Sequence, residues 1–165
     1  MLGKFFKKKE KDKDIVLYAP VDGELVPLEE VPDPVFAQKM MGDGVAIHPA
    51  NDVVTAPLDG EIIQLSETKH AIGIRGANGV EILIHIGLDT VNLKGEGFTA
   101  HIHEGDRVKK GDKLVSFDTK MIEEKATGTI IPIIITNTND MSEIHAEAKQ
   151  TVAAGENVIL TVKSN

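Results

Sequence analysis

An eight-residue pattern that occurs twice limits the folds open to this chain. APVDGELV at residues 19–26 returns as APLDGEII at residues 56–63. Each copy reads as strand, turn, strand, because glycine supplies the backbone conformation that a tight turn requires. No linker-like stretch separates the copies, so the repeat predicts duplication of a β unit within one domain.

Beyond residue 14 the chain alternates short apolar runs with glycine-containing pairs. The pairs are Asp22-Gly23, Asp43-Gly44, Asp59-Gly60, Asn78-Gly79, Glu104-Gly105, Gly111-Asp112 and Thr127-Gly128. This spacing predicts an all-β fold, an antiparallel β-sandwich or barrel with one or two short helical turns. A helix is expected at 33–40, where Asp33 can cap and Pro34 suits the first turn. Residues 142–149 fit either a helical turn or an edge strand.

Composition excludes several classes of protein. The 165 residues contain no cysteine, which rules out disulfides, thiolate metal sites and a cysteine nucleophile. No apolar run approaches the roughly 20 residues of a membrane-spanning helix, and the start lacks a secretory apolar region. We therefore expect a cytoplasmic protein in which residues 15–165 form a single domain.

Charge is divided unevenly along the chain. Residues 1–14 hold six lysines and three acidic residues, a net +3, so the formal total of −8 leaves −11 for the rest. The acidic body predicts that nucleic acid is not a partner and favours a basic protein partner. The basic head is expected to be flexible, and its Phe5 and Phe6 beside the lysines also allow a weak membrane contact with anionic lipid.

Residues 68–87 read as a β-hairpin with one histidine near each open end. If residues 76–79 form a four-residue loop, His70 lies directly opposite His85. If residues 78–79 form a two-residue turn, His70 lies diagonal to His85. A slip of two residues keeps the alternation of side chains, so both registers place the two imidazoles on one face of the sheet.

Two adjacent imidazoles suit phosphoryl transfer. A neutral imidazole is a nucleophile near pH 7, and the N–H of a second ring can stabilise a phosphoryl group on the first. Thr68, two residues before His70, is expected to fix the tautomer of that ring, while Leu83 and Ile86 provide apolar surroundings that limit hydrolysis. Two rings also suggest a zinc site if a partner supplies further ligands. The hairpin alone does not tell which ring carries the phosphate.

Several segments from about residue 15 onward carry a family resemblance. They are VPD at 31–33 with FA at 36–37, GDGVAI at 42–47, APLDG at 56–60, ETKHA at 67–71 and, most specific, HIGLDTVNLKGEGF at 85–98. These segments resemble the glucose-type IIA components of the bacterial phosphoenolpyruvate-dependent sugar phosphotransferase system. The resemblance implies an antiparallel β-sandwich that carries a phosphoryl group.

The resemblance also implies roles for individual residues. His85 would accept phosphate from the histidine-containing phosphocarrier protein HPr and pass it to a cysteine on the IIB domain of a glucose-family permease. His70 would match a second histidine needed for onward transfer, and Thr68 the hydroxyl that orients it. No cofactor is required, although zinc can bind the two histidines with a partner carboxylate. The partner surface would include Asp33, Phe36, Leu83, Ile86 and Asp89.

Three other interpretations are open at the level of sequence. GDRVKKGD at 105–112 with DTKM at 118–121 resembles a lipoyl or biotinyl carrier domain, in which Lys120 would be the attachment site. The simpler expectation is that Lys120 is a solvated turn residue. HIGLD at 85–89 and HIH at 101–103 mimic the ligand motifs of a lysostaphin-like zinc peptidase, in a different order relative to the glycine turn. The third is a non-enzymatic β-sandwich interaction module.

Overall fold

The structure, a computed structural model, describes residues 14–164. The predicted flexible basic segment at residues 1–14 lies outside the described residues, apart from Asp14. No helix between residues 14 and 164 is both long enough and apolar enough to cross a membrane.

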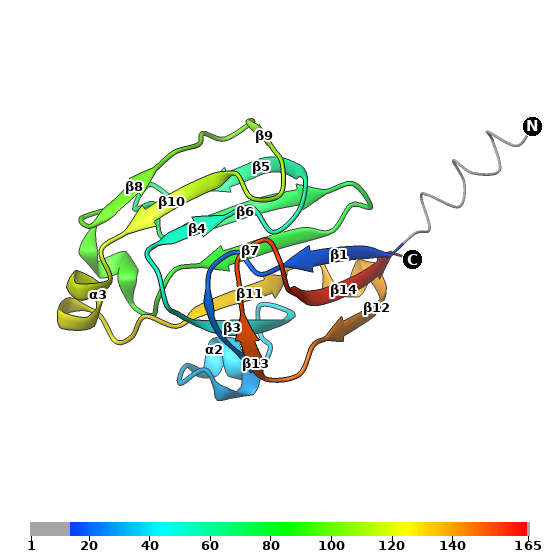
Figure 1. Cartoon of the computed structure of the whole chain (residues 1–165), viewed down its shortest axis with the longest axis horizontal. Helices are drawn as coiled ribbons and strands as arrows, with labels where there is room; N and C mark the ends of the chain where they lie inside the picture. The colour runs from blue at the N-terminus through cyan, green and yellow to red at the C-terminus, as the bar shows by residue number, and fades with distance from the viewer. Residues whose placement is uncertain (1–13, 165) are drawn as a thin grey trace, which may run out of the picture.

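An eight-stranded antiparallel sheet forms the body of the molecule (Figure 1). Its strands lie in the order β13 (Gln150–Val152), β2 (Gly23–Pro27), β3 (Asp43–Pro49), β11 (Ile131–Ile135), β7 (Glu81–His85), β6 (Ala71–Gly76), β5 (Gly60–Leu65), β9 (Arg107–Val108). Two smaller antiparallel sheets have the orders β1 (Ile15–Tyr18), β14 (Val158–Ser164), β12 (Met141–Ala146) and β4 (Val53–Thr55), β10 (Lys113–Phe117), β8 (Phe98–Ala100). The predicted all-β antiparallel sandwich is confirmed.

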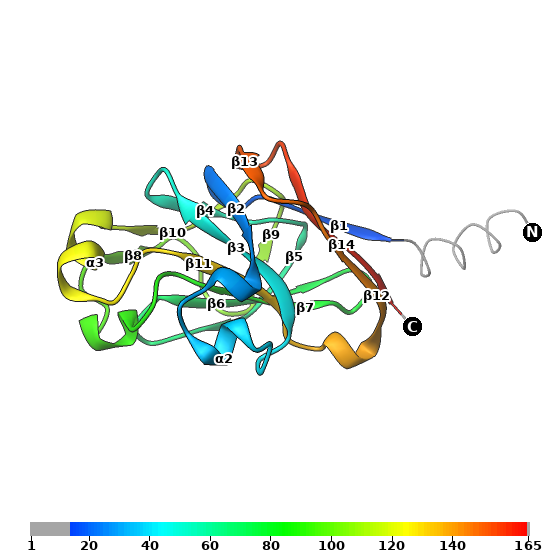
Figure 2. The same cartoon turned by 90° about the horizontal axis from the view of Figure 1, so that it is seen from below.

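The two faces of the large sheet bury different sets of apolar side chains. Ile133 and Ile135 join the main core, which also takes side chains from both small sheets, while Ile134 between them points to the opposite face. That opposite face is covered by η1 (Leu28–Glu30) and α2 (Pro34–Ala37), as Figure 2 shows. The cluster there, called here the outer cluster, comprises Val26, Leu28, Val31, Phe36, Ala46, Leu88, Ile130 and Ile134.

The short helices fit the sequence only in part. Helix α2 begins as predicted, with the Asp33 carboxylate accepting a hydrogen bond from the Val35 amide (2.9 Å), but ends at Ala37 rather than at residue 40. Helix α3 (Thr119–Lys125), capped by Asp118, occupies a stretch that the sequence had suggested was a turn. Two further 3-10 turns are η2 (Thr90–Leu93) and η3 (Thr138–Asp140).

Two segments that the sequence left open or assigned to a turn are β-strands in the structure. Residues 142–149 contain most of β12, an edge strand, rather than a helical turn. Asp43-Gly44 is not a turn but lies inside β3. The glycine is needed there because a Cβ on Gly44 would sit 2.0 Å from the carbonyl oxygen of Ile133 on the neighbouring strand.

The sequence repeat corresponds to a duplicated arrangement of strands. The Tyr18 amide donates to the Pro57 carbonyl (2.9 Å) and the Thr55 amide donates to the Pro20 carbonyl (2.8 Å), so the two copies bond to each other reciprocally. The large sheet also has equivalent strands when it is followed inward from its two ends. From one end the order is β13, β2, β3, β11, and from the other it is β9, β5, β6, β7. We call residues 53–117 the central half, and residues 15–49 with 131–164 the outer half.

Each copy is also closed by an equivalent side-chain contact. In the outer half Asp22 accepts a hydrogen bond from the Ala154 amide (2.7 Å), and in the central half Asp59 accepts one from the Lys110 amide (2.8 Å). The aspartate of each repeat therefore fixes a turn far along the chain, 132 residues away for Asp22 and 51 residues away for Asp59.

Candidate functional site

The hairpin that carries the two histidines has a register that the sequence did not predict. Arg75 pairs with Glu81, and Gly76 and Val80 are joined across a three-residue loop in which Gly79 is left-handed (φ 85°). This register lies one residue away from both predicted ones, so Ala71 rather than His70 faces His85. The strand-parity argument for the histidine pair was therefore wrong.

The imidazoles nevertheless meet, with ring centroids 4.9 Å apart and the ring planes at 79°. Regular strand geometry begins only at Ala71, and the preceding Lys69 has a left-handed backbone (φ 62°). This bend frees His70 from the alternation of β6, while its carbonyl still accepts a hydrogen bond from the Ile86 amide (2.7 Å). A local bend, not strand parity, brings the rings together.

The backbone after β7 fixes the orientation of the His85 ring. Its Nδ1 lies 2.7 Å from the Gly87 carbonyl oxygen, which can only accept a hydrogen bond. Nδ1 therefore carries the proton in the neutral ring, and Nε2 holds the free lone pair. Gly87 adopts φ 79°, and a Cβ there would lie 2.6 Å from Thr90 and 2.9 Å from the Gly128 carbonyl. Only glycine fits this position without strain.

The ring of His70 is held by the neighbouring threonine. Its Nδ1 lies 2.7 Å from the Thr68 hydroxyl, as predicted from the sequence, although both residues belong to the turn before β6. Burial and, secondly, the charge of His85 lower the pKa of His70 from 6.5 to about 4. His70 is thus neutral at pH 7.

Burial also lowers the pKa of His85, but three groups oppose that effect. They are the hydrogen bond to Gly87 and the carboxylates of Asp33 and Asp89. Asp33 comes from the outer half, at the start of α2, and Asp89 from the loop that follows β7. The lowered pKa leaves His85 neutral and nucleophilic near pH 7.

The apolar residues assigned to the site divide into two groups. Phe36 is 5% exposed and its ring centroid lies 5.1 Å from that of His85, so it forms a wall of the site. Leu83 is half-buried beside the outer cluster. Ile86, by contrast, is fully buried in the main core, because it follows His85 and points to the other face of the sheet. Ile86 is therefore not a surface residue, which corrects the prediction.

Two contributors to the site were missed in the sequence. The Gly87 carbonyl had a signal, since a glycine directly after a strand-end histidine indicates an unusual backbone conformation. The second is Thr127, whose hydroxyl donates a hydrogen bond to the Asp89 carboxylate across 38 residues of sequence. No local pattern could have indicated a contact of that range.

A metal site made by this chain alone is not supported within residues 14–164. No three histidine, cysteine, aspartate or glutamate side chains of that range cluster as metal ligands. The histidine pair offers two nitrogens, fewer than the four ligands of a typical zinc site.

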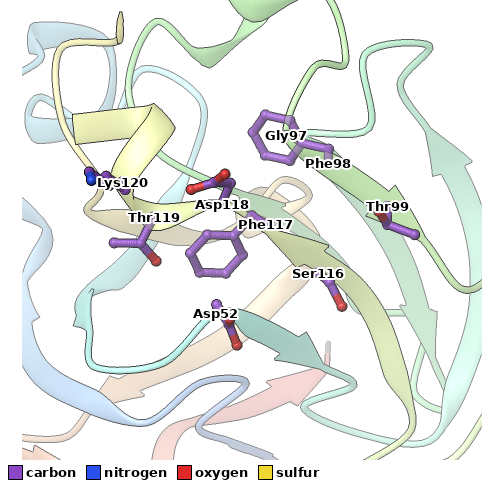
Figure 3. A pocket seen from close by; sticks show the side chains of 9 residues that line it. All are labelled: Asp52, Gly97, Phe98, Thr99, Ser116, Phe117, Asp118, Thr119 and Lys120. Atoms are coloured by element: carbon purple, nitrogen blue, oxygen red, sulfur yellow. The ribbon is translucent and has the colours of Figure 1, made fainter. Parts of the chain in front are cut away.

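Lys120 borders a hollow whose lining includes neither histidine. A hollow of about 590 Å³ is lined by the start of α3 and by β8 and β10 (Figure 3). Lys120 borders this hollow as an exposed residue in the first turn of α3, rather than in a β-turn. His101 and His103 are also exposed, and His101 bonds to Ser116 (2.7 Å). The lipoyl or biotinyl alternative is not supported by the comparisons that follow.

Comparisons with known proteins agree with the resemblance seen in the sequence. Residues 15–141 match the model of the family described as phosphoenolpyruvate-dependent sugar phosphotransferase system, EIIA 1. A protein of Oceanobacillus iheyensis named PTS system glucose-specific EIIA component is 60% identical over 163 residues, covering 98% of this chain and 99% of that protein. A Staphylococcus epidermidis protein of the same name is 48% identical, covering 96% and 95%.

A solved structure is similar over almost the same range. Glucose permease IIA from Mycoplasma capricolum superposes with a TM-score of 0.85 at 40% identity, covering 90% of this chain and 96% of that one. Sequence family, curated relatives and fold therefore agree. This chain belongs to the EIIA 1 family of the phosphoenolpyruvate-dependent sugar phosphotransferase system.

Proposed function

We propose that this chain carries a phosphoryl group on Nε2 of His85, between the phosphocarrier protein HPr and a cysteine on the IIB domain of a glucose-family permease. The observation that carries this proposal is the hydrogen bond from His85 Nδ1 to the Gly87 carbonyl, with the His70 ring 4.9 Å away. The proposal places the transfer in the cytoplasm.

The tautomer of His85 selects the reacting atom. With the proton on Nδ1, the lone pair of Nε2 attacks the phosphorus of the phosphohistidine on the donor. The new Nε2–P bond forms as the donor N–P bond breaks, and the donor imidazole leaves with the electron pair. The Gly87 carbonyl then stabilises the positive charge that develops on the His85 ring.

His70 acts on the transferred group rather than as a carrier. Because its pKa is about 4, it is neutral and holds one proton. If the Thr68 hydroxyl donates to Nδ1 of His70, the ring proton of His70 sits on Nε2. The Nε2–H group can then donate a hydrogen bond to a phosphoryl oxygen. Thr68 thus sets the tautomer, and His70 stabilises the phosphoryl group during onward transfer to the thiolate of IIB.

The surroundings of His85 favour a protein partner. Asp33 and Asp89 place negative charge beside the ring, and apolar side chains next to them remain exposed, with Val35 at 41% and Val91 at 51%. An acidic rim with apolar contacts suits a donor whose phosphohistidine is flanked by cationic and apolar groups. Phe36 and Leu83 limit the access of water to the P–N bond from the protein side.

Zinc is a second ligand that the pair could share. His85 offers Nε2 as a ligand, since its Nδ1 is bonded to the Gly87 carbonyl. His70 would offer its Nε2 only in the other tautomer, with the proton on Nδ1 and donated to the Thr68 hydroxyl. A four-coordinate site would need two further ligands from a partner, such as a carboxylate. When bound, zinc would crosslink the two proteins, and no step of phosphoryl transfer requires it.

The experiment that tests the proposal is reconstitution of the transfer. The protein is incubated with phosphoenolpyruvate, enzyme I and HPr, and we expect one phosphate that is labile to acid and stable to base. His85→Ala should abolish it, and His70→Gln should accept phosphate but pass it poorly to IIB. Failure of the wild-type chain to label, or labelling of His85→Ala, would contradict the proposal.

A further inference from the structure

The Asp89 carboxylate is held by a residue distant in sequence. Asp89 precedes η2 with a left-handed backbone (φ 60°), and its side chain makes no capping hydrogen bond to that turn. Instead the carboxylate accepts a hydrogen bond from the hydroxyl of Thr127, which lies in the connection between α3 and β11.

The backbone of that connection is fixed independently of this side-chain contact. The Leu88 amide donates to the Gly128 carbonyl (3.0 Å) and the Thr127 amide donates to the Leu88 carbonyl (3.2 Å), forming an isolated β-bridge. Leu88 itself is buried in the outer cluster. Removing only the Thr127 hydroxyl should therefore leave the backbone in place and release only the carboxylate.

Both carboxylates beside His85 thus have a dedicated donor. Asp33 is held by the Val35 amide and Asp89 by the Thr127 hydroxyl. Asp89 is exposed, and an exposed carboxylate without a partner would populate several rotamers, which weakens its field at any one point.

We propose that Thr127 is a positioning residue for phosphoryl transfer, holding the Asp89 carboxylate toward His85 and toward the cationic groups of an incoming phosphoryl donor. The proposal rests on the proposed function of His85. It assigns the connection after α3 a part in recognising the donor. Thr127 acts through Asp89 and does not touch the reacting atoms.

The test combines four variants of the full chain with one control. Thr127→Val removes the hydroxyl at nearly constant shape, Thr127→Ser retains it, and Asp89→Asn removes the charge; the fourth variant joins Thr127→Val with Asp89→Asn. The control is Thr136→Val, because the exposed Thr136 hydroxyl bonds only the Glu81 carbonyl (3.2 Å) at the far end of β11.

Transfer from phosphorylated HPr is measured as a function of donor concentration. We expect Thr127→Val to raise KM about fivefold with kcat within twofold, because a mobile carboxylate attracts the donor less well. Thr127→Ser and Thr136→Val should match the wild type within twofold. The double variant should match Asp89→Asn, and about 0.5 M salt should reduce the differences. An unchanged KM in Thr127→Val, no rescue by serine, or multiplying effects in the double variant would overturn the proposal.

A second measurement does not depend on transfer. Three-bond couplings by NMR should show one χ1 rotamer of Asp89 in the wild type and in Thr127→Ser, and averaging in Thr127→Val. An unchanged single rotamer in Thr127→Val would overturn the positioning role. Absence of any transfer to the wild-type chain would instead contradict the proposed function, while the couplings still decide whether Thr127 positions Asp89.

Discussion

The central and outer halves contribute equivalent strands to the large sheet in equivalent order, but only the central half carries a pair of histidines whose rings meet. The pairing of β2 with β3 and of β5 with β6 aligns Asp43 with His70. The pairing of β3 with β11 and of β6 with β7 then aligns Ile134 with His85. One position of the fold is thus a buried isoleucine in one half and the proposed phosphate carrier in the other.

The difference between the halves lies in the connection after the repeated strand. In the outer half, residues 28–42 form η1 and α2 and cover the sheet, so Ile134 is fully buried. In the central half, residues 66–70 form a short turn that ends in His70, and His85 is only partly buried. The outer half also supplies Phe36 as the wall of the site. The outer half therefore covers the sheet, and the central half carries the proposed phosphoryl site.

The largest expected effect comes from making the two halves alike. His85→Ile places in the central half the residue that the outer half has at the equivalent position. We expect complete loss of phosphate incorporation from HPr while the fold is retained, because isoleucine suits that position of the sheet. Labelling assays and circular dichroism check this. His145→Ile, which alters an exposed histidine on β12, is the control and should label normally.

The opposite exchange, Ile134→His, should not create a second site. It buries an imidazole among apolar side chains without a partner, which we expect to cost about 2 kcal/mol of unfolding free energy. Urea denaturation measures the loss. A second phosphate on this variant would show that sheet position alone makes a histidine reactive, contrary to the comparison.

The next effect is expected at the backbone after β7. Gly87→Ala combines a strained positive φ with contacts of 2.6 Å and 2.9 Å for the new Cβ, so the carbonyl that orients His85 should shift. We expect transfer to slow about 100-fold, as misplacement near 1 Å commonly does, and stability to fall by about 3 kcal/mol.

Gly79→Ala provides the matched control, since Gly79 has φ 85° and its added Cβ meets nothing within 4 Å. It should lose only about 1 kcal/mol of stability through strain and transfer at the normal rate. Equal rates in the two glycine variants would show that the Gly87 carbonyl does not orient the ring.

A smaller effect concerns pH. The pKa of folded His70 is about 4, below the ordinary 6.5 of an unfolded histidine. The unfolded chain therefore binds the proton first, and the free energy of unfolding should fall as pH drops from about 6.5 to 4, by up to about 3 kcal/mol. Above pH 6.5 the ring is neutral in both the folded and the unfolded chain, so this loss of stability does not occur there.

Denaturation of the wild type and of His70→Gln at pH 7.5, 6, 5 and 4, in chelator-treated buffer, measures this difference. His70→Gln should lose less stability on acidification. Parallel pH profiles for the two proteins would contradict the low pKa of the buried ring.

The smallest effect is expected at Lys69, whose left-handed backbone lets His70 meet His85. Lys69→Asn should raise stability by about 0.5 kcal/mol, because asparagine tolerates this conformation better than lysine. Thermal melting checks the gain against Lys113→Asn, an exposed strand position with ordinary backbone, where no gain is expected. A gain at both positions would indicate a charge effect rather than relief of strain.

The sequence was sufficient for the fold and for the identity of the histidine pair, but not for the way the pair is assembled. The repeated APxDGE pattern indicated the duplication, and Asp33-Pro34 indicated the start of α2. The hairpin register failed because a three-residue loop ending in left-handed Gly79 reverses the parity that two- or four-residue loops share. Loop conformation is fixed by backbone hydrogen bonds that residue identity does not specify uniquely.

The burial of Ile86 and one long-range contact were the other points missed in the sequence. Ile86 was assigned to the surface because it neighbours His85, although strand alternation alone places its side chain on the opposite face, where it joins the main core. Helix α3 was missed because Asp118-Thr119-Lys120 reads equally well as a turn. Thr127 donates a hydrogen bond to Asp89, 38 positions away in the sequence, and only the folded chain reveals this contact.

The central claim is that the Gly87 carbonyl leaves Nε2 of His85 as the atom that carries the phosphoryl group. Long-range ¹H–¹⁵N correlation spectra of the phosphorylated protein, labelled with ¹⁵N in histidine, identify the substituted nitrogen directly. We expect phosphorus on Nε2 of His85, a proton on Nδ1 and an unmodified His70 ring. Phosphorus on Nδ1 of His85, or on either nitrogen of His70, would contradict it.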